Sequence, residues 1–88
     1  MPYLMVSVSA KRHNIVYLSY DQEERQRNSE IYMWALELQT RVRKNHELIG
    51  FCQFLKIAEK NEWELIQNTG STTDEVIYLL HYTTEKSE

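Results

Sequence analysis

The sequence has few of the residues that interrupt regular structure, since its 88 residues include two glycines and one proline. Glycine and proline are the strongest breakers of helices and strands, so most of the chain is expected in regular elements. A chain of this length is one domain, and its core is thin because it buries only roughly 60–65% of its unfolded surface. Apolar residues make up 42% of the chain, which is typical of a folded domain and excludes a disordered one.

Cysteine and long apolar runs are also scarce. Cys52 is the only cysteine, so no disulfide can form within the chain, and we expect a reducing compartment, the cytoplasm. No apolar run approaches the roughly 18 residues of a membrane span. Residues 1–10 lack the charged start of a signal peptide. We therefore expect neither membrane association nor export.

Charge of one sign is not in large excess, because the formal net charge is −3. Such a balance excludes a nucleic-acid binder that relies on overall positive charge, and it equally excludes an acidic mimic of DNA. Any electrostatic recognition must come from local clusters.

Side chains that alternate between apolar and polar predict a strand over residues 3–10, with Leu4, Val6 and Val8 on its buried face. A polar break at residues 11–14 precedes a second strand-like run, 15–20. The two runs are expected to form a hairpin, although the break lacks the Asn-Gly or Asp-Gly pair of a tight turn.

The middle of the chain predicts two helices. Asp21 is a suitable cap, and the packed part of the first helix is expected to begin near Ser29 and to end near Asn45. The segment 48–60 fits one helical face, and its first part, 48–54, also fits a strand; we favour the helix. The residues that recur at helical spacing in the first helix are Ile31, Trp34, Ala35, Leu38 and Val42.

The last third reads as a strand beginning at Trp63, a polar turn over 68–75 and an apolar strand over 76–82. The whole pattern predicts the α+β fold class: one antiparallel sheet of about four strands in the order ββααββ, with both helices on one face. The domain is expected to span residues 1–84, followed by a disordered tail at 85–88.

Residues 55–82 contain a short helical pattern, the strand start Trp63-Glu64-Leu65-Ile66 and a closing strand with Tyr78, and in this they resemble a group of very small bacterial domains of unknown function. Those domains have a short helix, a Gly-Trp-Glu-Leu-Val strand start, a variable turn and a closing aromatic-rich strand. Glu62 stands here where they have glycine, so Asn61 would have to adopt the left-handed helix end, or the end differs. The resemblance implies a helix packed on an antiparallel sheet and no activity. The matching residues are Leu55, Ala58, Trp63, Glu64, Leu65, Ile66 and Tyr78.

Motifs for catalysis, cofactors or metals are missing. The histidines, His13, His46 and His81, are not spaced as metal ligands, and Gly50 and Gly70 are too isolated for a phosphate-binding loop. Cys52 shares a helical face with Leu48 and Leu55, so we expect an unreactive core thiol. Glu62 and Glu64 fall on one exposed face of a strand. We therefore expect no cofactor and no metal, and we lean against an enzyme.

The aromatic content points to an interface. The helix after Ser29 has apolar surface wider than one stripe, and Trp, Tyr and Met are enriched in interface cores. We expect Tyr32, Met33 and Leu36 to face a second copy in a homodimer or another protein. The favoured function is a non-catalytic assembly module, and its size and composition also suit a regulator or an antagonist carried by a phage or mobile element.

Two alternatives remain open. Basic clusters at 11–13 and 41–46, with nearby tyrosines, would suit a protein that binds single-stranded nucleic acid. An interfacial pocket with His81 and carboxylates would instead suit a dimer that binds a small molecule or is an enzyme. The candidate nucleic-acid patch comprises Lys11, Arg12, Arg41, Arg43 and Lys44.

Overall fold

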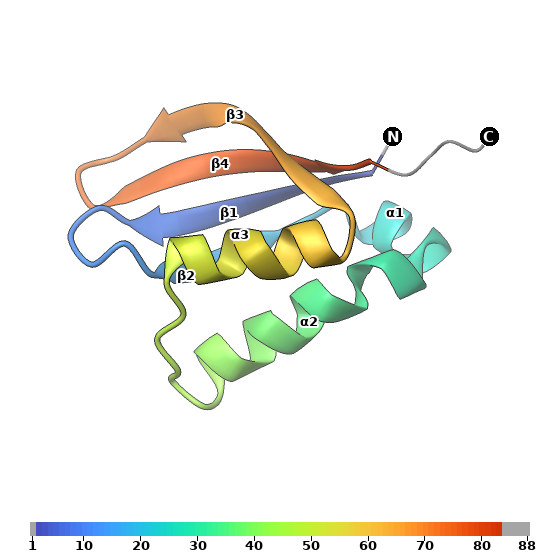
Figure 1. Cartoon of the computed structure of the whole chain (residues 1–88), viewed down its shortest axis with the longest axis horizontal. Helices are drawn as coiled ribbons and strands as arrows, with labels where there is room; N and C mark the ends of the chain where they lie inside the picture. Colours follow the sequence, from blue (N-terminus) through green and yellow to red (C-terminus); the bar gives the residue numbers. More distant parts are fainter. Residues whose placement is uncertain (1, 84–88) are drawn as a thin grey trace.

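The computed structural model describes residues 2–83 and places three helices against one sheet (Figure 1). The sheet has four strands in the spatial order β2-β1-β4-β3, and every neighbouring pair is antiparallel. The predicted α+β class and its ββααββ order are confirmed. The helical part contains three helices, and the proposed tail at 85–88 lies outside the described residues. In chain order the elements are β1 Tyr3–Ser9, β2 Ile15–Ser19, α1 Gln22–Arg27, α2 Ser29–Arg43, α3 Phe51–Lys60, β3 Trp63–Ser71 and β4 Glu75–Tyr82.

Asn28 divides the predicted first helix into α1 and α2. Its backbone leaves the helical region, at φ −127° and ψ 46°, and its side-chain Nδ2 donates to the Glu24 carbonyl at 3.1 Å. Asp21 caps the start of α1 through its Oδ1, which accepts from the backbone N–H of Glu23 at 2.8 Å. α1 has no buried residue, so its position depends on these caps and on α2.

The core lies between the sheet and the helices α2 and α3. Val6 and Leu80 are fully buried from the sheet side, and Tyr32 and Phe54 from the helix side. Trp63 is 1% exposed and donates its indole N–H to the Ile31 carbonyl at 3.0 Å, so its ring belongs to the core. Polar partners of this kind let large aromatic rings be buried without an unsatisfied donor.

The prediction that a helix begins at Leu48 and buries Cys52 is wrong. Leu48 is 71% exposed, and Cys52 is exposed on the first turn of α3. Residues before Phe51 extend along β2 instead, since the N–H of Ile15 donates to Ile49 and Asn14 forms a bridge with Gly50. These backbone bonds rotate α3 so that Phe54 and Ala58 face the core.

The two edges of the sheet differ in protection. On β2, Leu18 has both backbone groups bonded to the side chain of Gln39 from α2: its N–H donates at 3.1 Å and its carbonyl accepts at 2.9 Å. β3 continues to Ser71, through part of the predicted turn. Two register shifts against β4 bend it, one between Leu65 and Gln67 and one between Asn68 and Gly70. Both devices limit pairing of an edge with another strand.

α3 ends with a non-glycine residue in the left-handed conformation. Glu62 has φ 68°, whereas Asn61 has φ −101°, so Glu62 itself takes the conformation that glycine favours. The carbonyl of Glu62 is then positioned to accept the N–H of Thr83 at 2.8 Å, which ties the start of β3 to the end of β4.

Candidate functional site: the open face of the sheet

The sheet has one covered face and one open face, because the helices lie on one side only (Figure 1). Along β1, Leu4 and Val6 point to the helices, whereas Tyr3 and Met5 point away and remain 46% and 40% exposed. The pairing register aligns Met5 with Leu79 of β4, so Leu79 shares the open face. Apolar side chains therefore occupy both faces of the sheet.

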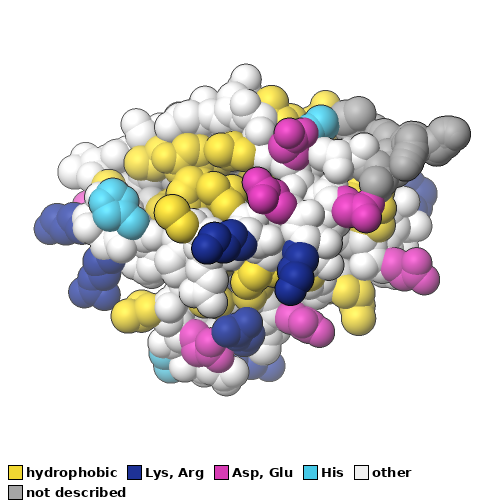
Figure 2. Space-filling view, viewed as in Figure 1, with side chains coloured by type: hydrophobic (Ala, Val, Ile, Leu, Met, Phe, Trp, Pro, Cys, Tyr) yellow, Lys and Arg dark blue, Asp and Glu magenta, His cyan; other side chains and the backbone are white. Residues whose placement is uncertain are grey.

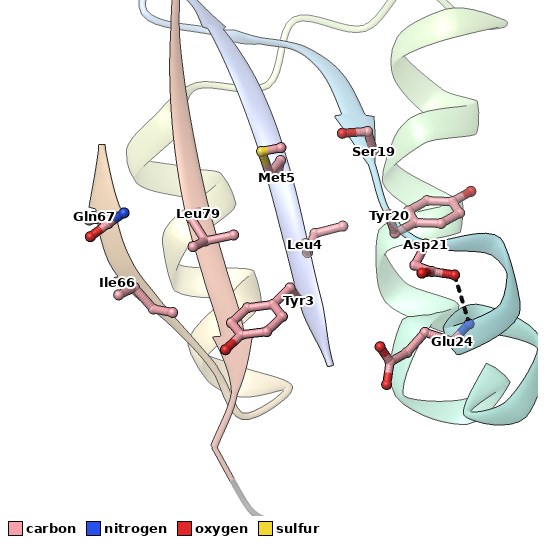
Figure 3. Close-up of a pocket in the computed structure, with 10 residues that line it drawn as sticks. All are labelled: Tyr3, Leu4, Met5, Ser19, Tyr20, Asp21, Glu24, Ile66, Gln67 and Leu79. Carbon is pink, nitrogen blue, oxygen red and sulfur yellow. Dashed lines mark hydrogen bonds between the residues drawn. The ribbon is translucent and has the colours of Figure 1, made fainter. Parts of the chain in front are cut away.

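A groove runs across the open face at the end of the sheet where β2 stops (Figure 3). Its volume is about 630 Å³. The groove exists because β2 ends at Ser19, opposite Met5, and the chain then turns away into α1. Residues from four strands and one helix line it: Tyr3, Leu4, Met5, Ser19, Tyr20, Asp21, Glu24, Ile66, Gln67 and Leu79.

A bulge in β3 places Ile66 and Gln67 on this face together. The register of β3 against β4 skips one residue between Leu65 and Gln67, and Ile66 is that residue. Its side chain is 42% exposed and points toward Leu79 and Tyr3 in Figure 3. Without the bulge, strict alternation along β3 would not place Ile66 and Gln67 in one groove.

Carboxylates form one wall of the groove. Asp21 uses Oδ1 as the cap of α1, accepting from the N–H groups of Glu23 and Glu24 at 2.8 and 3.3 Å. Glu24 is half-buried, and within residues 2–83 its carboxylate has no ion pair. Figure 3 shows that carboxylate directed from α1 toward the groove. This wall makes the site electrically negative.

Tyr32 lies beneath the groove and responds to this charge. Its hydroxyl donates to the Tyr3 carbonyl at 3.1 Å. Burial, followed by the negative charges of Glu24 and Asp21, raises the pKa of Tyr32 to about 12. The hydroxyl therefore stays protonated and continues to satisfy a β1 carbonyl beyond the end of β2.

His81 and Glu64 form a polar pair beside the apolar part of the open face. They are opposite each other on β4 and β3, and His81 Nε2 lies 3.5 Å from Glu64 Oε1. The pair becomes an ion pair only when the imidazole is protonated. Neither residue lines the groove, and the predicted pocket of His81 and carboxylates, which would lie at a subunit interface, stays a prediction.

The predicted interface on α2 needs correction at Tyr32. Tyr32 is 0% exposed, so it cannot contact a partner. Its ring packs against Trp63 at a centroid distance of 5.2 Å and against Tyr20 at 5.6 Å, which accounts for its burial. Met33 is 55% exposed and Leu36 is half-buried, so α2 offers one exposed apolar side chain where a broad patch was expected.

Hydrophobic side chains are also exposed on the face of the molecule shown in Figure 2. Phe51, Leu55 and Tyr78 are half-buried and pack on the core. The rings of Phe51 and Tyr78 stack with centroids 4.5 Å apart. This ring contact joins the start of α3 to β4.

The basic residues of the candidate nucleic-acid patch come from two parts of the fold. Lys11 and Arg12 lie in the β1–β2 turn, which Figure 1 shows well apart from the C-terminal end of α2, where Lys44 caps the helix. Arg43 lies over the ring of Tyr17, 5.8 Å from its centroid. Lys and Arg side chains are interleaved with acidic ones over the view in Figure 2.

Arg41 is held by Glu47 in an exposed ion pair. The guanidinium donates to Glu47 Oε1 from Nη2 at 2.9 Å and from Nε at 3.0 Å. This hydrogen bond lowers the pKa of the Glu47 carboxyl and raises that of Arg41. The pair fixes the loop after α2, so Arg41 is already engaged within the chain.

Within residues 2–83, no group of three or more His, Cys, Asp or Glu side chains is arranged to hold a metal ion. None of the helices in that range is long and apolar enough to cross a membrane. Comparison with protein-family models, with curated proteins and with solved structures found no match. The open face and its groove are therefore the features on which a functional proposal can rest.

Proposed function

We propose that this chain is a non-catalytic protein-binding module that self-associates through the open face of its sheet. The observation that supports it is the set of apolar side chains left uncovered on that face. Tyr3, Met5, Tyr17 and Ile66 are each 40–46% exposed. Contiguous apolar surface of this kind is typical of interaction sites.

A second copy is a suitable partner because it presents the same kind of surface. Two sheets can pack face to face at a separation of about 10 Å with their side chains interdigitated. A two-fold arrangement lets one face serve both chains. The proposal moves the interface from α2, where Tyr32 is buried, to the opposite side of the molecule.

Light scattering combined with size exclusion tests the proposal. At about 100 μM, a concentration at which a specific interface of standard size is occupied, the chain should have twice the mass of one copy. Met5→Glu combined with Ile66→Glu should give a folded monomer, with folding checked by circular dichroism. Met33→Glu is the matched control, because Met33 is the exposed apolar residue of α2 and should leave the dimer intact.

Two results would contradict the proposal. A monomeric parent chain at that concentration would show that the open face does not bind a second copy, and its apolar surface would then belong to a different protein partner. Loss of the dimer in Met33→Glu, with retention in the double variant, would return the interface to the helical side.

A further inference from the structure

The groove on the open face crosses the strands, which determines the shape of what it can hold. It extends from Ile66 and Gln67 of β3, over Leu79 of β4 and Met5 of β1, to Glu24 of α1. Three strand spacings correspond to roughly 14 Å. The volume of about 630 Å³ falls in the range of small-molecule sites. An occupant would be elongated and would lie at right angles to the strands, unlike an added β-strand.

The lining differs along this length. The middle is apolar, with Met5, Leu79 and Ile66 side by side in Figure 3, and Tyr3 adds an aromatic ring. The α1 end carries carboxylates, and among residues 2–83 no Lys or Arg side chain lines the groove. A ligand that matches this pattern has an apolar body and a positive charge at one end.

Glu24 is the group that lacks a partner. It is half-buried at the groove, and no cation in residues 2–83 pairs with it. The guanidinium of Arg25, the next residue, instead donates to Gln22 Oε1, from Nη2 at 3.3 Å and from Nε at 3.4 Å. A partly desolvated carboxylate is stabilised by an opposite charge more than a solvated one is.

We propose that the groove binds an elongated organic cation, with its ammonium group beside Glu24 and its apolar body across Met5, Leu79 and Ile66. All the lining residues come from one chain, so this inference goes beyond self-association. Met5 and Ile66 also belong to the face that the proposed dimer would cover, so the amine and a second copy compete for it. The binding experiments therefore use a dilute sample whose monomeric state is verified by light scattering. A small amine is the expected ligand because it matches both the volume of the groove and its single charged end.

Three probes with one apolar body and different head groups test the charge requirement: 4-phenylbutylamine, 4-phenylbutan-1-ol and 4-phenylbutyrate. Each is titrated into the ¹⁵N-labelled full chain at pH 7 and followed by the shifts of backbone amide resonances. The amine should bind about two- to fivefold more tightly than the alcohol, as expected for one partly exposed ion pair. The shifted amides should belong to the groove, and the butyrate should bind most weakly.

Glu24→Gln is the test variant, because it removes the charge and keeps the shape. It should bring the affinity for the amine down to that for the alcohol. Glu23→Gln is the matched control, because Glu23 is the preceding residue of α1 and is exposed and outside the groove. This variant should change the ratio of amine affinity to alcohol affinity by less than twofold. Circular dichroism establishes that both variants are folded.

Several outcomes would overturn the inference. Equal binding of the amine and the alcohol would remove the charge requirement, and an equal effect of the two variants would remove the role of Glu24. Shifts confined to residues away from the groove would place the site elsewhere. Absence of binding by all three probes at about 10 mM, weaker than any typical small-ligand affinity, would reject the site.

Discussion

The two faces of the sheet have similar residues and opposite roles. On β1, Leu4, Val6 and Val8 are 0–3% exposed, whereas Tyr3 and Met5, one position away, are 40% exposed or more. All five are apolar or aromatic. Residue type therefore does not distinguish the covered face, which stabilises the fold, from the open face. The two faces differ because the helices pack on one of them.

Ring contacts separate the two faces more sharply than composition does. On the covered face, Trp63 contacts Tyr32, Trp34 and Tyr82 with centroid distances of 5.2, 6.2 and 5.8 Å. Among the ring pairs in residues 2–83, none includes Tyr3 or Tyr17 of the open face. The covered face is a connected aromatic cluster, whereas the open face has tyrosine rings without aromatic neighbours.

The strongest test of this comparison places one charge on either side of β1. Val6→Glu would bury an unpaired carboxylate at a fully buried position, which costs several kcal/mol and should unfold a marginal domain. Met5→Glu should change the free energy of unfolding by less than about 1 kcal/mol. Urea denaturation in dilute solution measures both. Similar losses for the two variants would mean that the open face is covered in solution.

A second test removes the centre of the aromatic cluster. Trp63→Ala should cost roughly 3–5 kcal/mol, through lost burial and the cavity left behind. Leu65→Ala is the control on the same strand and should cost much less, since Leu65 is 38% exposed. Thermal unfolding followed by circular dichroism compares the two. A Trp63→Ala variant as stable as the parent would show that β3 does not pack as described.

The fold was largely predictable because its strands are short, alternating and separated by polar breaks. Leu4, Val6 and Val8 show the period of two that a half-buried strand requires, and Trp63 begins a similar pattern. The start of α3 was not predictable. The apolar residues of 48–54 fit both periods, and backbone bonds from Ile49 and Phe51 to the start of β2 decide the outcome.

The candidate site was less predictable than the fold. Its groove combines residues 3–5, 19–21, 24, 66–67 and 79, which no local motif connects. A bulge adds Gln67 to the face that Ile66 already shares, and bulges have no strong sequence signal. Tyr32 was assigned to an interface because helical spacing shows how wide an apolar surface is, but not which elements cover it. Only the tertiary arrangement places Trp63 and Tyr20 against it.

A third test uses Tyr32, which is buried between α2 and the covered face of the sheet. The pKa of Tyr32 is raised from 10.0 to about 12, so above pH 10 the unfolded chain loses its proton first and stability falls until about pH 12. Tyr32→Phe should cost about 1 kcal/mol at neutral pH through the lost hydrogen bond to Tyr3. Its difference from the parent should shrink as pH rises above 10. Parallel curves for parent and variant would contradict the raised pKa, and Tyr17→Phe is the exposed control.

The smallest expected effect alters neither face and is a stabilisation. Glu62 joins α3 to β3 at φ 68°, where a non-glycine residue is strained by about 1–2 kcal/mol. Glu62→Gly removes that strain and adds about 0.5–1 kcal/mol of chain entropy to the unfolded state. The net gain should be about 0.5–1 kcal/mol, or a rise in Tm of a few degrees. Glu62→Ala is the informative control, because alanine also disfavours positive φ and should bring no gain. A gain in both variants would trace the effect to the lost charge, and a gain in neither would mean that the helix end is unstrained. A gain in stability in Glu62→Gly alone, with self-association and amine binding unchanged, would show that the domain can be stabilised without altering the open face.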